Sequence, residues 1–184
     1  VILKGDIDYW IEGGKIDLKP WAVIVVGDGD QAAAVERLRS ELDERGWFED
    51  EQKQQPPAFP KRVGVVTSLR GDARYDIQNA IHEQDPTVDI VVKDATVQGS
   101  EAPTSIANGI HHLDRSADVD SIIVGRGGGS DSNLQAFNTE RVAEAIFTAN
   151  TPIVTAIGHT DDRLIADQVA DVATITPTAA GEYI

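Results

Sequence analysis

Short apolar segments alternate with amphipathic segments after residue 61, and this alternation restricts the fold more than any other feature of the sequence. The apolar segments are rich in Val and Ile, which is typical of strands buried on both faces. The segments between them carry apolar residues at helical spacing. The pattern predicts an α/β fold, with a parallel sheet flanked by helices in Rossmann-like β-α repeats. The expected strand and helix pairs are Arg62–Ser68 and Asp72–His82, Val88–Val92 (continuing towards Val97) and Glu101–Leu113, Ser121–Val124 and Asp131–Ala149, and Pro152–Ile157 and Asp161–Ala170.

The chain before residue 61 follows other patterns. Residues 1–28 show two or three strands with a Gly13-Gly14 turn, too few to close a barrel, and resemble the tail of a β domain. Residues 29–60 predict a helix from Gln31 to Arg45 and then a polar, Pro-rich linker. We therefore expect a domain boundary in the linker and an α/β domain over residues 61–184. Because the chain starts in a strand pattern without a Met, we expect a fragment of a longer protein.

Glycine, hydroxyl, arginine, histidine and aspartate residues follow the carboxyl ends of the expected strands. Ligands of open parallel sheets bind at this edge. The loops at the opposite edge contain ordinary turn-forming residues. This asymmetry predicts a site beyond the strand ends, formed by residues 67–72, 97–99, 125–129 and 158–162.

The loop after the third strand combines three consecutive glycines with one long side chain, Arg126. Glycines let the backbone approach a ligand closely, and amides before a helix can form an anion cradle. The planar guanidinium of an arginine suits phosphate. The alternative is an ordinary tight turn with a surface arginine. The phosphate-binding candidates are Ser68, Gly127, Gly128, Gly129 and Ser130.

Three further residues at the same edge suit proton transfer. His159 is the natural general acid or base, or else a capping residue. Asp162 would orient that imidazole, share a metal, or only stabilise a helix N-terminus. Asp76, one turn into the first helix, faces the cleft or is a solvated helix residue. With Arg126 these groups form a constellation for phosphoester hydrolysis. Other acidic residues are expected to be surface charge: Asp161, Asp167 and Asp171.

The charge balance conflicts with a phosphate-rich ligand. The chain of 184 residues has 31 acidic and 16 basic residues, for a net charge of −15. An acidic surface argues against a polyanionic partner unless salt is high, since the screening length falls to ~3 Å at 1 M. We therefore expect a halophilic source.

The cysteine count and the hydropathy pattern bear on location. The absence of cysteine fits a reducing compartment, and we expect a cytoplasmic protein. No apolar run is long enough for a membrane span, so we expect no membrane partner. No His/Cys spacing of a structural zinc site occurs.

Several motifs in this order resemble the large subunit of exodeoxyribonuclease VII. The likeness is dense over residues 60–182 and looser over residues 1–50, where Gly46-Trp47-Phe48 stands in place of a Gly-Leu-Phe-like turn. The motifs are Phe59–Ser68 with Ala73, Asp76 and Ile77, Val97–Gly99 with Ala102, Ile122–Ser130 with Leu134, Phe137 and Asn138, Pro152–His159 with Asp162, and Asp167, Ala170–Asp171 and Thr176–Ala180 with Glu182.

The resemblance implies a catalytic domain that cleaves single-stranded DNA from either end into 5′-phosphorylated oligonucleotides. It implies that Asp76, Arg126, His159 and Asp162 are the catalytic residues. Mg²⁺ is the cofactor that this chemistry would use, and the resemblance does not fix whether the ion is strictly required.

The resemblance also implies that residues 1–28 are the C-terminal part of an OB-fold that binds single-stranded DNA. Its aromatic residues are then either base-stacking platforms or core. These residues are Tyr9, Trp10 and Trp21.

The resemblance further implies a small helical partner subunit, although the helical region that recruits it is missing after Ile184. The chain departs from the family at Ser132-Asn133 and Thr160-Asp161, where acidic residues and Glu-Thr are usual, which bears on any metal site. Two alternatives remain beside the nuclease. One is a catalytically impaired module that binds single-stranded DNA or nucleotides, and the other is a nucleotide or phosphosugar enzyme.

Overall fold

The computed structural model describes residues 2–10, 15–24, 28–116, 118–127, 134–158 and 163–184. The chain forms two compact units, residues 1–37 and 38–184. None of the described helices is both long and apolar enough to cross a membrane.

The first unit contains an antiparallel strand pair. Strand β1 (Ile2–Trp10) pairs with β2 (Lys15–Ile24), and the helix α1 (Asp28–Glu44) begins in this unit and ends in the second. The register shifts between Lys4, opposite Ala22, and Gly5, opposite Pro20, so Trp21 is the extra residue of a β-bulge. A proline is tolerated at a bulge, which explains why β2 continues through Pro20. The expected Gly13-Gly14 turn lies outside the described residues.

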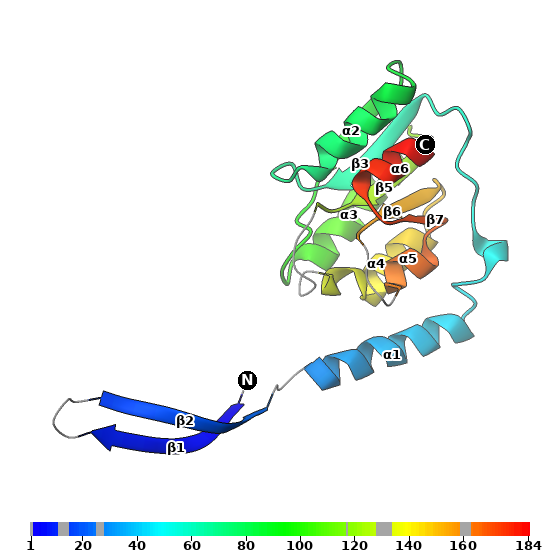
Figure 1. The fold of residues 1–184 in the computed structure, drawn as a ribbon. Helices are drawn as coiled ribbons and strands as arrows, with labels where there is room; N and C mark the ends of the chain where they lie inside the picture. Colours follow the sequence, from blue (N-terminus) through cyan, green and yellow to red (C-terminus); the bar gives the residue numbers. More distant parts are fainter. Residues whose placement is uncertain (1, 11–14, 25–27, 117, 128–133, 159–162) are drawn as a thin grey trace. The chain divides into compact units, whose positions relative to one another are not determined.

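The second unit is built on a five-stranded sheet, in which every neighbouring pair is parallel (Figure 1). The predicted α/β fold with a parallel sheet flanked by helices is therefore confirmed. The strand order is β4-β3-β5-β6-β7, with β4 (Asp89–Asp94), β3 (Arg62–Thr67), β5 (Ser121–Gly125), β6 (Ile153–Ala156) and β7 (Val172–Thr174).

Helices cover both faces of this sheet (Figure 1). Helices α2 (Ala73–Gln84) and α6 (Pro177–Tyr183) pack on the face that contains Val63 and Val65. Helices α3 (Ala102–Ser116), α4 (Glu140–Phe147) and α5 (Ile165–Val169) cover the other face. Burial on both faces explains why the central strands read as continuous apolar runs.

Two helix-to-strand contacts and one helix-to-helix contact are very close. A Cβ on Gly64 of β3 would lie 2.9 Å from Leu113 Cδ1, and one on Gly109 of α3 would lie 2.8 Å from Val66 Cγ1. A Cβ on Gly181 of α6 would lie only 2.7 Å from the carbonyl oxygen of Ile77 in α2. The two helices α2 and α6 therefore meet with almost no space between their backbones.

The third expected helix, Asp131–Ala149, is shorter than predicted. The described part consists of a 3₁₀ turn, η3 (Gln135–Phe137), and then α4. Between them the Thr139 hydroxyl donates to the Ala136 carbonyl at 2.8 Å, and Asn138 Oδ1 accepts from the Ile165 amide at 2.9 Å. Such side-chain bonds compete with helical backbone bonds and end the turn.

The C-terminal part also differs from the prediction. The fourth expected helix, Asp161–Ala170, is limited to α5 in the described residues, and β7 and α6 follow it. A strand of three residues is too short to show a period. Helix α6 does carry a start signal, since Thr176 Oγ1 accepts from the Ala179 amide at 3.1 Å and Pro177 follows it.

Strand β4, the second strand expected after residue 61, ends at Asp94 rather than near Val97. The Ala95 amide still donates to the Thr67 carbonyl at 2.9 Å, but the Thr96 amide donates to the Ser105 hydroxyl at 2.9 Å. The backbone leaves the ladder because α3 supplies this alternative acceptor.

The Pro-rich segment before β3 is hydrogen-bonded to the sheet unit. The 3₁₀ turn η1 (Asp50–Gln52) precedes Lys53, whose ammonium donates to the carbonyls of Gln168 and of Ala170, the latter at 2.8 Å. The Gln54 side chain donates to the Ala149 carbonyl at 2.9 Å. Residues 38–60 belong to the same compact unit as the sheet.

Candidate functional site

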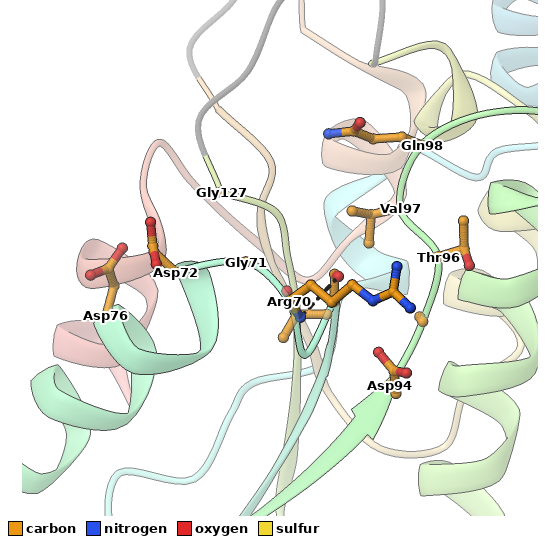
Figure 2. Close-up of a pocket in the computed structure, with 12 residues that line it drawn as sticks. Arg70, Gly71, Asp72, Asp76, Asp94, Thr96, Val97, Gln98 and Gly127 are labelled. Atoms are coloured by element: carbon orange, nitrogen blue, oxygen red, sulfur yellow. Dashed lines mark hydrogen bonds between the residues drawn. The ribbon is translucent and has the colours of Figure 1, made fainter.

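A cleft of about 710 Å³ lies at the carboxyl ends of β3 and β4 (Figure 2). Its walls come from the loop after β3, the loop after β4, the first turn of α2 and the residue Gly127 after β5. This is the edge at which the strand-end argument predicts a ligand. The lining residues are Thr67, Ser68, Arg70, Gly71, Asp72, Asp76, Asp94, Ala95, Thr96, Val97, Gln98 and Gly127.

The loop after β3 is held by its own hydrogen bonds and by β4. Ser68 accepts twice, its hydroxyl from the Arg70 amide at 3.3 Å and its carbonyl from the Gly71 amide at 3.2 Å. The Leu69 amide donates to Asp94 Oδ1 at 3.0 Å. These bonds fix the backbone from which Arg70 and Asp72 enter the cleft.

The first turn of α2 lies against the glycine-rich loop. A Cβ on Gly127 would lie 3.7 Å from the Ala73 nitrogen and 3.9 Å from the Asp72 nitrogen, so the two backbones are close neighbours. The Asp72 side chain does not cap the helix, and its carbonyl accepts from the Asp76 amide at 3.1 Å. The carboxylates of Asp72 and Asp76 therefore stand one helical turn apart, both exposed to the cleft (Figure 2).

Arg126 is buried rather than exposed. Only 4% of its surface is accessible, and its Nε donates to the Gly127 carbonyl at 3.0 Å. Its amide donates to the Ala156 carbonyl at 3.1 Å, which ties the end of β5 to the end of β6. The expectation that Arg126 is a surface residue in the alternative interpretation is therefore wrong, whereas the loop at 128–133 lies outside the described residues. Arg126 is not among the described residues that line the cleft. Gly127 does line it, and the hydrogen bond from Arg126 orients the peptide of Gly127.

The structure brings some of the predicted site residues together. Ser68, Asp76 and Gly127 line one cleft, and Arg126 adjoins it through Gly127. Tyr9, Trp10 and Trp21 lie on β1 and β2 in the other unit. Their catalytic, phosphate-binding and stacking roles remain predictions. The predicted residues outside the described part of the chain are Gly128, Gly129, Ser130, His159 and Asp162.

Several residues that line the cleft were not selected from the sequence. Arg70 and Asp72 belong to a loop that the pattern identifies, but nothing in the sequence shows which of its side chains enter the cleft. Asp94 was missed because the strand was expected to continue to Val97, which would have moved the loop by three residues. Thr96 also lines this wall, next to Gln98 of the predicted segment 97–99.

Two acidic residues expected at the surface are instead partly buried beside β6. Burial raises the pKa of Asp167, while the Thr155 hydroxyl, which donates to its Oδ1 at 2.6 Å, works in the opposite direction. Burial also raises the pKa of Asp171, although its carboxylate accepts from the amides of Ile153 and Gln54 at 2.6 Å each. The expectation of surface charge is wrong at both positions, because each carboxylate satisfies a buried donor.

The described residues contain no cluster of three or more His, Cys, Asp or Glu side chains that would hold a metal. Three carboxylates line the cleft: Asp94, Asp72 at the N-cap of α2, and Asp76 four residues further on in the first turn of α2. Two carboxylates with water and a substrate phosphate are a usual environment for Mg²⁺.

Comparisons with known proteins agree with the motifs. The model of the family described as "Exonuclease VII, large subunit" matches residues 47–184. The exodeoxyribonuclease 7 large subunit of Brevibacillus brevis is 44% identical over 181 residues, which cover 98% of this chain and 39% of the relative. That of Desulfitobacterium hafniense is 41% identical over 182 residues, covering 99% and 45%.

The relative from Sodalis glossinidius, with the same description, is 39% identical over 184 residues and covers 100% of this chain and 40% of its own length. The chain thus spans about two fifths of the length of the curated relatives it matches. The resemblance predicted from the motifs is confirmed. The chain belongs to the exonuclease VII large-subunit family.

Proposed function

We propose that this chain is the catalytic part of an exodeoxyribonuclease that hydrolyses single-stranded DNA to 5′-phosphorylated oligonucleotides. One observation carries the proposal: Gly127, the start of α2 and the Asp76 carboxylate meet in one cleft at the carboxyl edge of the sheet. Family membership gives this cleft its expected substrate.

The proposed phosphate position lies between Gly127 and the first turn of α2. Unpaired amides at a helix N-terminus and the helix dipole favour a negative group. Arg126 lies behind Gly127 with its charge largely shielded from solvent, so its field acts on the loop with little screening. A phosphate held there would lie within one helical turn of Asp76.

Formation of 5′-phosphates breaks the bond between phosphorus and the O3′ oxygen. One group must therefore take a proton from the attacking water, and another must give a proton to O3′. We assign the first task to Asp76 and the second to His159, with Asp162 orienting the imidazole. The assignment rests on the family motifs and, for Asp76, on its place in the cleft.

Mg²⁺ is the proposed cofactor. Asp72 would supply a protein ligand, because its carboxylate lines the cleft beside Asp76 and Mg²⁺ prefers oxygen ligands and retains water. When bound, the ion would reduce the negative charge on the phosphate oxygens.

The other parts of the proposal concern partners and environment. The strand pair β1–β2 would be the C-terminal part of an OB-fold, in which Tyr9, Trp10 and Trp21 stack with bases. A small helical subunit would be the protein partner, in keeping with the family's description as a large subunit. We also propose a cytoplasmic location and a halophilic source, the latter on the strength of the net charge of −15.

The test is an assay on single-stranded DNA labelled at either end, with and without chelator, at low and molar salt. We expect the chain to release short 5′-phosphorylated products. Asp76→Asn, His159→Ala and Asp162→Ala should each lower the rate at least about 100-fold, the usual contribution of general acid–base groups. Chelator should abolish cleavage, and Mg²⁺ should restore it.

The matched control is His112→Ala, which removes an exposed histidine of α3 outside the cleft. It should cleave as the wild type does. Equal cleavage by the wild type and all the site variants would contradict the proposal. DNA binding that survives His159→Ala, without turnover under any condition, would support the binding-module alternative instead.

A further inference from the structure

We infer that Arg70, on the wall of the cleft opposite Asp76, binds a second phosphate of the DNA strand and so sets the position of the strand in the site. This inference rests on the proposed function, because it takes a nucleic-acid strand as the ligand of the cleft. It adds a residue that the motifs do not select.

Charged side chains lie at both ends of the cleft, and Arg70 shares its end with Asp94 (Figure 2). Asp72 and Asp76 lie at one end, beside Gly127. The Arg70 side chain extends away from these two carboxylates, towards the loop after β4 that carries Thr96. If a DNA strand places one phosphate at Gly127, the Arg70 guanidinium can therefore contact only another phosphate of that DNA strand.

The Arg70 guanidinium is available to a ligand. Among the residues that the structure describes, none forms a hydrogen bond or ion pair with it, although its backbone amide is bonded to Ser68. Arg70 also carries the only positive charge among the described residues that line the cleft. In a chain with a net charge of −15, one unpaired arginine in a cleft is the natural contact for phosphate.

The protein fixes the backbone on both sides of this guanidinium. Three hydrogen bonds hold residues 69–71, and one of them runs from the Leu69 amide to Asp94 Oδ1 at 3.0 Å. On the facing wall, the Ser105 hydroxyl accepts from the Thr96 amide at 2.9 Å. The exposed Thr96 and Gln98 side chains add uncharged donors on that wall. The phosphate contact is thus made by an exposed side chain on a hydrogen-bonded backbone.

The size of the cleft agrees with a ligand that has more than one phosphate. Its volume of about 710 Å³ lies in the upper part of the range for sites that bind drug-sized ligands, roughly 300–1,000 Å³. A single phosphate would leave most of it empty.

The test measures binding of labelled oligothymidylate to the whole chain by fluorescence anisotropy, over a series of salt concentrations. Intact DNA is verified on a gel after each titration. Arg70→Ala should weaken binding at least about tenfold, since one charge-assisted contact is lost. It should also reduce the slope of log affinity against log salt by about 0.7, the value for one phosphate of a single strand. Arg70→Lys should keep the slope and lose part of the affinity.

The matched control is Arg62→Ala. It also removes one positive charge, but from the first residue of β3, whereas Arg70 follows the end of β3. Arg62 is exposed and pairs with Asp89 at 3.2 Å, outside the cleft. Its removal should leave the salt slope unchanged. Equal slopes for the wild type, Arg70→Ala and Arg62→Ala would overturn the inference, and so would a wild type that binds no DNA.

A second measurement uses thymidine dinucleotides, with and without a 5′-phosphate, as competitors of the labelled strand. The wild type should prefer the dinucleotide with two phosphates, and Arg70→Ala should lose most of this preference. An unchanged preference in the variant contradicts the inference while cleavage stands. If Arg70→Ala loses the preference and the wild type never cleaves DNA, the result supports the inference and contradicts the proposed function.

Discussion

At the scale of single residues, β6 is held by a carboxylate near each end. Asp171 accepts the amide of Ile153 at the start of the strand, and Asp167 accepts the hydroxyl of Thr155 near its end. Both side chains have raised pKa values because burial disfavours their ionised form. The strand that leads to residues 159–162 is therefore positioned by side chains that the sequence pattern assigns to the surface.

Asp167→Asn tests the sign of this pKa shift. The unfolded carboxyl ionises at its ordinary pKa of 3.8, below the raised folded value, so the unfolded chain loses its proton first as the pH rises. The stability contributed by Asp167 thus falls as the pH rises from 3.8 through the folded pKa and stays low above it. Asn keeps an oxygen acceptor for Thr155. We expect the free energy of unfolding of the variant, relative to the wild type, to increase between pH 3.5 and 7 in urea titrations.

Asp85→Asn is the control with the opposite sign. The Thr87 hydroxyl donates to Asp85 and lowers the pKa of that carboxyl, so its contribution is complete above the ordinary pKa and is lost as the pH falls through the lowered value. The relative stability of this variant should therefore decrease with rising pH. Parallel pH profiles for the two variants would contradict the assignment.

At the scale of elements, α2 connects the core to the cleft. Its inner face carries Ile77 and Ile81 into the core, and its first turn carries Asp76 into the cleft. Helix α6 presses on the same inner face at Gly181, where a Cβ would meet the Ile77 carbonyl oxygen and Ala80 Cβ at 2.7 Å each. A backbone atom cannot move aside as a side-chain end can, so this packing leaves no room for a larger residue.

Gly181→Ala should lower the free energy of unfolding by about 1–3 kcal/mol, the usual effect of overpacking. Gly71→Ala is the control for space, because its nearest atom, the Ser68 carbonyl oxygen, would lie 3.8 Å from the new Cβ. Urea unfolding of both variants decides the question. If Gly181→Ala is as stable as the wild type, α2 and α6 are not in direct backbone contact.

At the scale of the whole molecule, acidic residues outnumber basic residues by 31 to 16. A net charge of −15 on 184 residues produces repulsion that opposes the compact state at low salt. Salt reduces this repulsion, because the screening length falls from about 10 Å at 0.1 M to about 3 Å at 1 M.

The midpoint of thermal unfolding should therefore rise by several degrees between 0.1 M and 2 M KCl, because screening relieves this repulsion. The same experiment in KBr separates screening from other salt effects, since both salts screen equally. An unchanged midpoint in both salts would rule out the proposed halophilic adaptation. A rise in KCl alone would assign the effect to the chloride salt rather than to screening.

The agreement between sequence and structure follows the physical origin of each element. The strands β3, β5 and β6 could be predicted because burial on both faces demands continuous Val and Ile. Helix α4 was predicted too long because the Thr139 and Asn138 side chains end the preceding turn through tertiary and local hydrogen bonds. Strand β7 leaves no periodic signal, since it contains only three residues.

The same distinction applies to the cleft. Its position at the carboxyl edge could be predicted from topology, and three of the residues selected from the sequence, Ser68, Asp76 and Gly127, line it, while their roles stay predictions. The entry of Arg70 depends on the bond between the Leu69 amide and Asp94, which joins two loops distant in sequence. No local pattern encodes such a bond.

The Asp171 carboxylate, which joins the Pro-rich segment to β6, has a mechanical consequence. The Asp171 carboxylate links the amides of Gln54 and Ile153, so tension applied to the chain ahead of β3 would reach the sheet through β6 first. The load would then run across the two hydrogen bonds of Asp171, at 2.6 Å each, before it followed the covalent path. Rupture of this link under force should precede extraction of β3.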